Sequence, residues 1–257
     1  MINISEIERF YPENQRPFKR NILREYLQYR ILQIIFDTRF SVSLSFMGGT
    51  CLRIVFGTNR FSEDLDFDNF GITFDEFDQL ADIIAFRLRE EGYQTEIRTV
   101  SKGAFHCYIR IPELLFNNNL SGFREEKILI QLDTEFQQYR YNPVPFLLNK
   151  FDILTRIFHT PQEILLSQKI RAILNRKTPK GRDYYDVMYL WSLTKPDYNY
   201  LAEKENIDNP AMLKQRLLEK LEITDLTGLI KDVSPFLITD TDAKRIELFP
   251  EFVRSIS

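Results

Sequence analysis

A short stretch in the first quarter of the chain has the residue types of a phosphate-binding turn. Gly48 and Gly49 are adjacent, which allows a tight turn and a close approach of the backbone to a ligand. Thr50 follows at the expected start of a helix over residues 50–56, where free backbone N–H groups and a hydroxyl suit a phosphate. A strand over residues 41–47 is expected to lead into this turn.

Two carboxylates follow closely. Residues 61–67 read as a strand, and side chains two apart on a strand lie on the same face, so Asp64 and Asp66 should point together. Their charges, about 7 Å apart, would repel each other, and a divalent metal is the usual compensation. Ser62 could serve only to order the turn before this pair. A phosphate-binding turn followed by paired carboxylates predicts nucleotidyl transfer.

Other side chains could complete such a site. Asp133 lies late in an alternating strand over residues 127–133, on the face opposite a row of aliphatic side chains. It is a candidate third metal ligand, or a group that activates the attacking hydroxyl. Arg60 and Lys169 are candidate cations for the phosphates. Each could equally have a structural role, and it is their order along the chain that is informative.

Local patterns predict the elements that would position these residues. Residues 1–18 are expected to form a loosely structured arm. Apolar periodicity, a capping box at Thr73 and Glu76, and glycine and proline stops predict the remaining elements. They are helices over residues 19–38, 73–92, 160–175, 182–190, 211–221, 226–233 and 241–255, and strands over residues 93–100 and 104–111.

Composition and single residues restrict the class of protein. Of 257 residues 44% are hydrophobic, which is enough for one large core or two small ones. Cys51 and Cys107 lack metal-ligand spacing and are expected to be buried, and His106 and His159 have no evident partner. A signal peptide is not evident and no apolar run approaches the about 18 residues that a membrane span needs. We therefore expect a cytoplasmic protein without a membrane partner.

Charge is unevenly distributed although the formal net charge is only -3. Residues 61–91 hold ten acids and two bases, whereas residues 150–182 hold eight bases and two acids. The basic run could meet a polyanion such as RNA, or it could be a solvated helix face.

The order of the motifs resembles a known family. The chain reads Gly48-Gly49-Thr50-x-Leu52-Arg53, Arg60-x-Ser62-x-Asp64-x-Asp66-Phe67, Lys169-x-x-Ala172 and Arg182-Asp183-x-Tyr185-Asp186-x-x-x-Leu190. This set is similar to the AbiE-type toxins (AbiEii/AbiGii), which belong to the DNA polymerase β-like nucleotidyltransferase superfamily. The resemblance spans roughly residues 19–193.

The resemblance implies the toxin of a bacterial toxin–antitoxin or abortive infection system, with a cognate antitoxin as partner. Such an enzyme would move NMP from an NTP to RNA, with tRNA as the expected acceptor, using Mg²⁺ or Mn²⁺ and releasing pyrophosphate. Carried over by position, the expected metal ligands are Asp64, Asp66 and Asp133. The expected nucleotide-binding residues are Gly48, Gly49, Thr50, Arg60, Ser62, Lys169, Asp183 and Asp186, and Lys169 is also expected to act in catalysis with the three metal ligands.

The expected fold is α/β (α+β), with a small mixed sheet and a mainly helical C-terminal domain. Residues 1–142 would form the nucleotidyltransferase core with its N-terminal helix, and residues 143–257 a helical domain that closes the active-site cleft. Two alternatives stay open. The acceptor could be a protein or small-molecule hydroxyl, or the chain could be a non-catalytic nucleotide-binding module. Asp183 could also only cap its helix.

Overall fold

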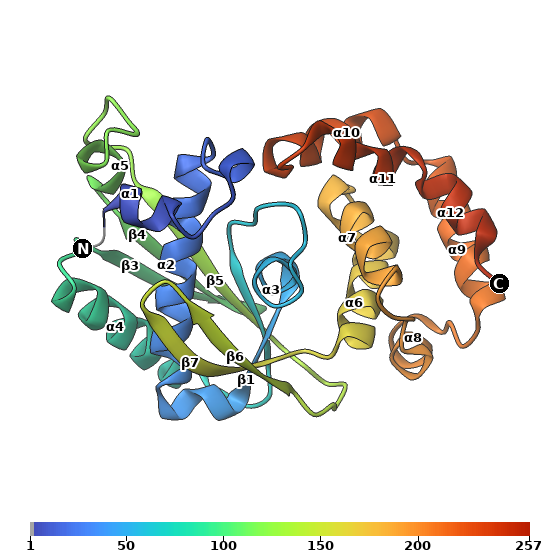
Figure 1. Ribbon diagram of the computed structural model, residues 1–257. Coiled ribbons are helices and arrows are strands. Elements are labelled where there is room, and N and C mark those ends of the chain that lie inside the picture. The colour runs from blue at the N-terminus through green and yellow to red at the C-terminus, as the bar shows by residue number, and fades with distance from the viewer. Residues whose placement is uncertain (1–2) are drawn as a thin grey trace. The chain divides into compact units, whose positions relative to one another are not determined.

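The computed structural model describes residues 3–257 of the chain (Figure 1). Two compact units are present. Unit 1 comprises the residues up to Cys51 together with Phe61–Thr160, and unit 2 comprises Leu52–Arg60 and Pro161–Ser257. The short segment 52–60 therefore leaves the first unit, joins the second and returns.

Unit 1 is built on a seven-stranded mixed sheet with the strand order β3-β4-β5-β2-β1-β7-β6. The strands are β1 (Leu44–Met47), β2 (Leu65–Asn69), β3 (Glu96–Lys102), β4 (Ala104–Ile111), β5 (Ile128–Phe136), β6 (Val144–Lys150) and β7 (Ile153–His159). The pairs β2/β5 and β1/β7 are parallel and the others antiparallel. This confirms the expected α/β class with a mixed sheet.

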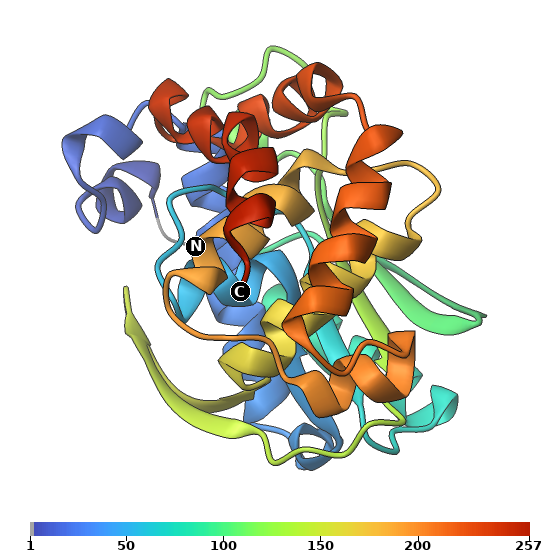
Figure 2. The ribbon, with the colours of Figure 1, turned by 90° about the vertical axis from the view of Figure 1, so that its right-hand side faces the viewer.

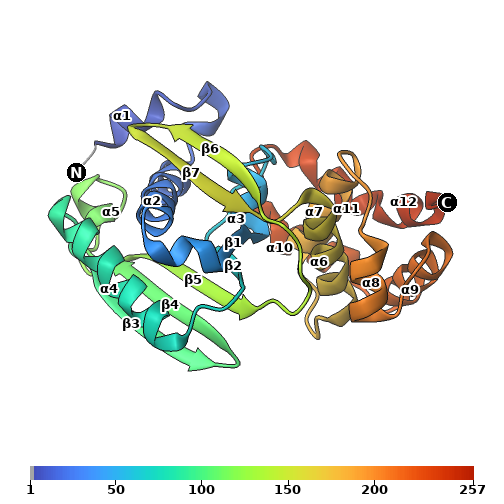
Figure 3. The same cartoon turned by 90° about the horizontal axis from the view of Figure 1, so that it is seen from below.

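Two long helices cover one face of this sheet, as Figure 3 shows from below. They are α2 (Lys19–Phe36) and α4 (Phe74–Glu90). The ring centroids of Phe36 in α2 and Phe67 in β2 are 6.3 Å apart, and those of Phe77 in α4 and Phe105 in β4 are 5.7 Å apart. Because successive strand residues face opposite ways, the residues next to Phe67 and Phe105 in the chain lie on the other face of the sheet. We call this face the open face.

The N-terminal arm is more ordered than the sequence analysis predicts. Residues 1–2 lie outside the described part, but α1 (Ile4–Glu8) follows with a complete capping box from Asn3. Ile7 and Tyr11 are buried, and the Tyr11 hydroxyl donates to Glu25 at 2.8 Å. The arm therefore packs on α2. Further short elements of unit 1 are η1 (Glu13–Gln15), η2 (Arg39–Ser43), α3 (Gly48–Ile54), which crosses the boundary between the units, and α5 (Leu114–Asn117).

The hairpin β6–β7 was not predicted, because the chain was expected to be mainly helical after residue 142. Along β7 the burial alternates strictly, with Ile153 and Ile157 facing the core and Leu154 exposed. Pro145 lies in β6, which is the edge strand, and a proline is tolerated there because no further strand needs its N–H. The clear period-2 pattern is therefore in β7, which contains no proline, whereas β6 contains Pro145.

Unit 2 is helical, and its main helices face the viewer in Figure 2. They are α6 (Gln162–Asn175), α7 (Gly181–Trp191), α8 (Tyr198–Glu205), α9 (Pro210–Glu222), α10 (Leu226–Val233), α11 (Lys244–Glu247) and α12 (Phe249–Ser255), with single turns η3 (Ser234–Phe236) and η4 (Asp240–Ala243). Tyr184, Leu190 and Phe249 are among its fully buried side chains. Among the helices described, none combines the length and hydropathy that crossing a bilayer requires.

Candidate active site

A row of candidate functional side chains crosses the open face of unit 1. The strand register pairs Met47 with Asp66, Asp66 with Asp133, and Asp133 with His106. Residues paired in this way point to the same face on strands about 4.8 Å apart. Asp66 and Asp133 come from segments almost 70 residues apart in the chain, and the parallel pairing of β2 with β5 makes them neighbours.

The carboxylate of Asp133 is held by two side chains. His106 places its Nδ1 atom 2.8 Å from Asp133 Oδ1, and the Gln131 amide donates to both carboxylate oxygens at 2.9 and 2.8 Å. Sequence reasoning missed His106. Its only local signal was a place in the alternating strand over residues 104–111, because its partner lies 27 residues away.

Gly48 makes room for Asp66. A Cβ atom on residue 48 would lie 2.1 Å from Asp66 Oδ2, and the backbone there has φ +76°, which L side chains rarely adopt. The Asp66 carboxylate is thus packed against the backbone at the start of α3. Thr50 is buried, and its hydroxyl donates to the backbone carbonyl of Asp64. In this structure the Thr50 hydroxyl ties α3 to the loop before β2.

The predicted strand over residues 61–67 is wrong in its bounds, because β2 is Leu65–Asn69. Asp64 therefore lies just before the strand, and the residue that shares the open face with Asp66 inside it is Asp68. Asp68 is almost fully buried and accepts hydrogen bonds from Tyr141 and from Gln137 at 3.0 Å. Burial and the Asp68 charge raise the pKa of Tyr141, so its phenol stays protonated.

The segment between Arg60 and Asp64 is anchored to α2 rather than to the sheet. The Gln28 amide donates to the backbone carbonyls of Ser62 at 3.1 Å and Glu63 at 2.9 Å. Irregular backbone held in this way explains why the strand begins only at Leu65. The nucleotide-binding role of Ser62 stays a prediction.

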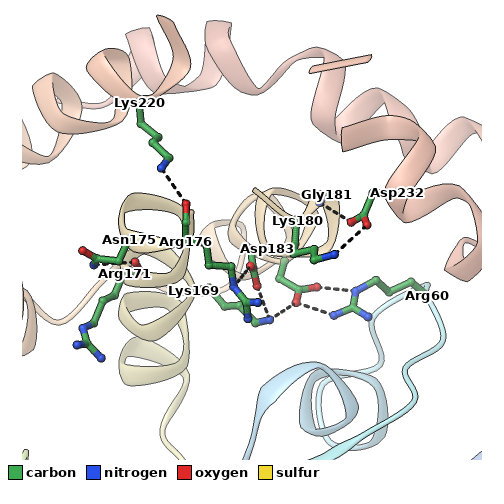
Figure 4. A network of polar contacts seen from close by, with 11 residues as sticks. Arg60, Lys169, Arg171, Asn175, Arg176, Lys180, Gly181, Asp183, Lys220 and Asp232 are labelled. Carbon is green, nitrogen blue, oxygen red and sulfur yellow. Dashed lines mark hydrogen bonds and ion pairs between the residues drawn. The ribbon is translucent and has the colours of Figure 1, made fainter. Parts of the chain in front are cut away.

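A second cluster lies within unit 2, and Figure 4 shows several of its members. Arg60 makes a two-pronged ion pair with Asp186, with Nε–Oδ1 at 2.7 Å and Nη2–Oδ2 at 2.6 Å. Lys169 of α6 lies 2.9 Å from oxygens of both Asp183 and Asp186 of α7. Arg176 adds a contact of 2.9 Å to Asp183. These five residues form what we call the α6–α7 ion network.

Burial is the largest single influence on the pKa values of Asp186 and Lys169, but the neighbouring charges together exceed it. Burial alone would raise the pKa of Asp186, but the charges of Arg60 and Lys169 outweigh it and lower that pKa. Burial would likewise lower the pKa of Lys169, but Asp183 and Asp186 raise it. Asp186 and Lys169 are therefore both ionised at neutral pH. The Arg60 side chain is only 1% exposed, so its guanidinium group is buried inside the fold.

The basic run over residues 150–182 is largely neutralised inside its own units. Lys150 pairs with Glu25, Arg171 with Glu205 and Lys180 with Asp232. Lys169 and Arg176 belong to the α6–α7 ion network. Five of the eight bases are thus ion-paired, which weakens the expectation of a wide surface for a polyanion.

The donor chemistry of the open face fits a hard divalent cation. Mg²⁺ at nucleotide sites is usually held by one or two carboxylates together with substrate phosphates. Asp66 and Asp133 supply two carboxylates on adjacent strands, and Asp133 is held as a hydrogen-bond acceptor. Over residues 3–257, no three or more His, Cys, Asp or Glu side chains gather into a metal-holding group. A three-carboxylate set including Asp64 therefore stays a prediction.

Both cysteines are buried, as predicted, and they are not linked to each other. Burial raises the pKa of Cys51 well above its usual value and that of Cys107 to about 12. Neither thiol therefore forms a reactive thiolate at neutral pH.

Comparison with known proteins identifies the family. The family model described as nucleotidyl transferase AbiEii toxin, type IV TA system, matches residues 30–246. None of the curated proteins compared with the chain matches it. Among solved structures, JHP933 from Helicobacter pylori shares 16% identity and a TM-score of 0.53, with 91% of each chain covered. An H. pylori protein described as a "putative nucleotidyltransferase" shares 17% identity and a TM-score of 0.51, covering 91% of this chain and 94% of that one.

At these identities the two structures show a shared fold, whereas the family model covers most of the chain. It also spans the glycine turn, the carboxylate row and the α6–α7 ion network. The chain therefore belongs to the AbiEii family of nucleotidyltransferase toxins of type IV toxin–antitoxin systems.

Proposed function

We propose that this enzyme transfers NMP from an NTP to a hydroxyl of RNA, with tRNA as the acceptor, and releases pyrophosphate. The observation that carries the proposal is the pair Asp66 and Asp133, neighbours on the open face, with Asp66 packed against Gly48. Two carboxylates beside a glycine backbone suit a divalent ion and a triphosphate.

In this proposal Asp66 and Asp133 hold the ion, which when bound neutralises the triphosphate and polarises the phosphorus under attack. The backbone of Gly48 and Gly49 lets the phosphates approach closely. Lys169 pairs with Asp183 and Asp186 within unit 2, and its role toward the nucleotide stays a prediction. Asp133 can also accept the proton of the attacking hydroxyl.

Nucleotide transfer is tested with purified protein, Mg²⁺, each labelled NTP in turn and total tRNA. We expect label on RNA with at least one NTP. The variant Asp66→Asn should lower the rate by about 100-fold or more, because holding the ion is worth several kcal/mol of transition-state stabilisation. Its stability should be kept, since the amide has the size of the carboxylate and removes repulsion from Asp133.

The matched control is Glu135→Gln, which removes an exposed carboxylate from the same strand as Asp133. We expect its transfer rate to stay within about twofold, since surface substitutions of this kind have small effects. Equal activity of Asp66→Asn and wild type would refute the assignment of Asp66.

A second candidate function keeps the same donor site with a protein or small-molecule hydroxyl as acceptor. The neutralisation of the basic run favours keeping it in the test. Label that migrates with protein or small solute, and not with RNA, would support it. An absence of label with all four NTPs and all three acceptor classes would contradict both functions.

Membership of a toxin–antitoxin family implies an antitoxin counterpart for this toxin. We propose that it is encoded beside the toxin gene. Sequencing the neighbouring genes and co-expressing each with the toxin checks this, and growth rescue by one of them is the expected result.

A further inference from the structure

His106 and Gln131 clamp one carboxylate of the candidate site. The imidazole reaches Asp133 Oδ1 from β4, and the Gln131 amide reaches both oxygens from the same strand as Asp133. The side chains of His106 and Asp133 are 26% and 28% exposed, so the cluster stands at the surface of the open face. Asp66 is the next residue in the same row.

The contact defines the roles of the imidazole nitrogens. An ionised carboxylate only accepts hydrogen bonds, so Nδ1 of His106 carries the proton donated to Asp133. The Gln131 amide is placed across the carboxylate, and with Nδ1–H it restricts rotation about the Asp133 Cβ–Cγ bond. That torsion is otherwise broad in aspartate.

Stability alone does not account for this arrangement. Exposed pairs of this kind contribute about 0–1 kcal/mol to folding. By contrast, donors that orient a metal-holding carboxylate change metal affinity or activity by about 10–100-fold when removed. The position of the clamp beside Asp66 agrees with the second role.

We propose that His106 is a positioning residue of the nucleotidyl-transfer site. Its Nδ1–H, together with the Gln131 amide, fixes the orientation of the Asp133 carboxylate beside Asp66, so that the two carboxylates hold a divalent ion without further rearrangement. This rests on the proposed function of Asp66 and Asp133 as the residues that hold the ion.

The first test uses two amides that imitate different nitrogens of the ring. In His106→Asn the side-chain amide lies near the place of Nδ1 and can still donate to Asp133, whereas in His106→Gln it lies near the place of Nε2. His106→Leu removes both. We expect the Mg²⁺ concentration for half-maximal rate to rise about 10–100-fold in the Gln and Leu variants. In the Asn variant it should stay within about fivefold of wild type.

The KM for the NTP at saturating Mg²⁺ should change less than about threefold in all three variants, because the clamp acts through Asp133 and not on the nucleotide. Tyr108→Phe, on the same strand and the same face, is the matched control and should behave as wild type. The proposal is overturned if His106→Leu keeps the wild-type Mg²⁺ requirement, or if His106→Asn is as impaired as His106→Leu.

A second readout does not depend on catalysis, because the chain has only two histidines. His159 is buried, bonds through Nδ1 to the Thr160 carbonyl at 2.9 Å and pairs with Phe46, so it faces the helix-covered side of the sheet. In proton NMR, Mn²⁺ added with a nucleotide should broaden the ring signals of His106 before those of His159, since paramagnetic relaxation falls steeply with distance. The Asp66→Asn variant should lose this preference.

These two measurements separate the failure of the inference from the failure of the proposed function. Preferential broadening of His106 in a protein that transfers no nucleotide would support the positioning of Asp133 at an ion site and refute the transfer reaction. Transfer without preferential broadening of His106 would overturn the inference and leave the transfer reaction standing.

Discussion

Gly48 shows how one residue can satisfy two requirements at once. Its φ of +76° is open to glycine at little cost, and the space where its Cβ would stand is filled by Asp66. Sequence reasoning read the two glycines as room for a ligand. The structure adds that Gly48 makes room for a carboxylate of the protein itself, which brings the backbone and Asp66 together before any ligand binds.

Replacing Gly48 by alanine should therefore cost more than backbone strain. Gly103 has nearly the same φ, +75°, but open space around it. We expect Gly103→Ala to lower the free energy of unfolding by about 1–2 kcal/mol, the cost of a left-handed conformation for an L-residue. Gly48→Ala should cost more and also abolish nucleotide transfer, because the new methyl displaces the Asp66 carboxylate. Chemical denaturation and the transfer assay, run on both variants, check this.

Equal destabilisation by the two alanines, with transfer kept in Gly48→Ala, would show that the close approach to Asp66 is unimportant.

Helix α7 is held in unit 2 by ion pairs as well as by packing. Asp183 and Asp186 are three residues apart, so they share a helix face, and that face meets Lys169 of α6 and Arg60 of the segment 52–60. Lys169 bridges both carboxylates. Replacing Lys169 would disturb the fold of α6 and α7 as well as any phosphate contact, so loss of activity in such a variant would not by itself define its role.

Asp186→Asn should destabilise unit 2 strongly. Removing one partner of a buried ion pair takes away the main compensation of the Arg60 charge and costs about 3–5 kcal/mol. Glu203→Gln is the matched control in the same unit, because Glu203 is half exposed in its pair with Lys204, and it should cost at most about 1 kcal/mol. Denaturant unfolding at pH 7 measures both. A cost below 1 kcal/mol for Asp186→Asn would contradict the importance of the pair.

The sign of the pH dependence follows from the lowered pKa of Asp186. A carboxylate whose pKa is lower in the folded state stabilises the fold above its ordinary value of 3.8, and this is lost as the pH falls through the folded pKa. The stability difference between wild type and Asp186→Asn should be constant near neutral pH and shrink below about pH 3.8.

At the scale of the whole molecule, unit 2 is not a continuous piece of chain. It takes residues 52–60 from within the sequence of unit 1. This segment is tied into unit 2 by Arg60 to Asp186, by the Tyr189 hydroxyl donating to the Phe56 carbonyl, and by a β-bridge between Arg60 and Leu237.

The fragment of residues 161–257 should consequently fail to unfold cooperatively. It lacks Arg60, so Asp186 would be buried with Lys169 as its remaining strong partner. The same fragment with residues 52–60 joined through a flexible linker should regain a cooperative transition. Circular dichroism during thermal and denaturant unfolding compares the two. Cooperative unfolding of the short fragment would show that Arg60 is dispensable.

The sequence alone determined the features whose signals are local. The capping box of Thr73 and Glu76 begins α4 as predicted, and the strand over residues 104–111 is β4 with the same bounds. Caps, turns and periodicity act over a few residues, so they can be read without the fold. The order of the motifs was enough to indicate the family, because each motif is itself a local pattern.

Only the tertiary structure decided which side chains meet. Strand pairing placed Asp133 beside Asp66 and joined it to His106, and the anchoring of the preceding loop by Gln28 moved the start of β2 past Asp64. Register between strands distant in sequence depends on the packing of the whole sheet, and shifting it by one residue would turn every side chain to the opposite face. The sequence showed which carboxylates could act in a site, and the fold showed which side chains contact them.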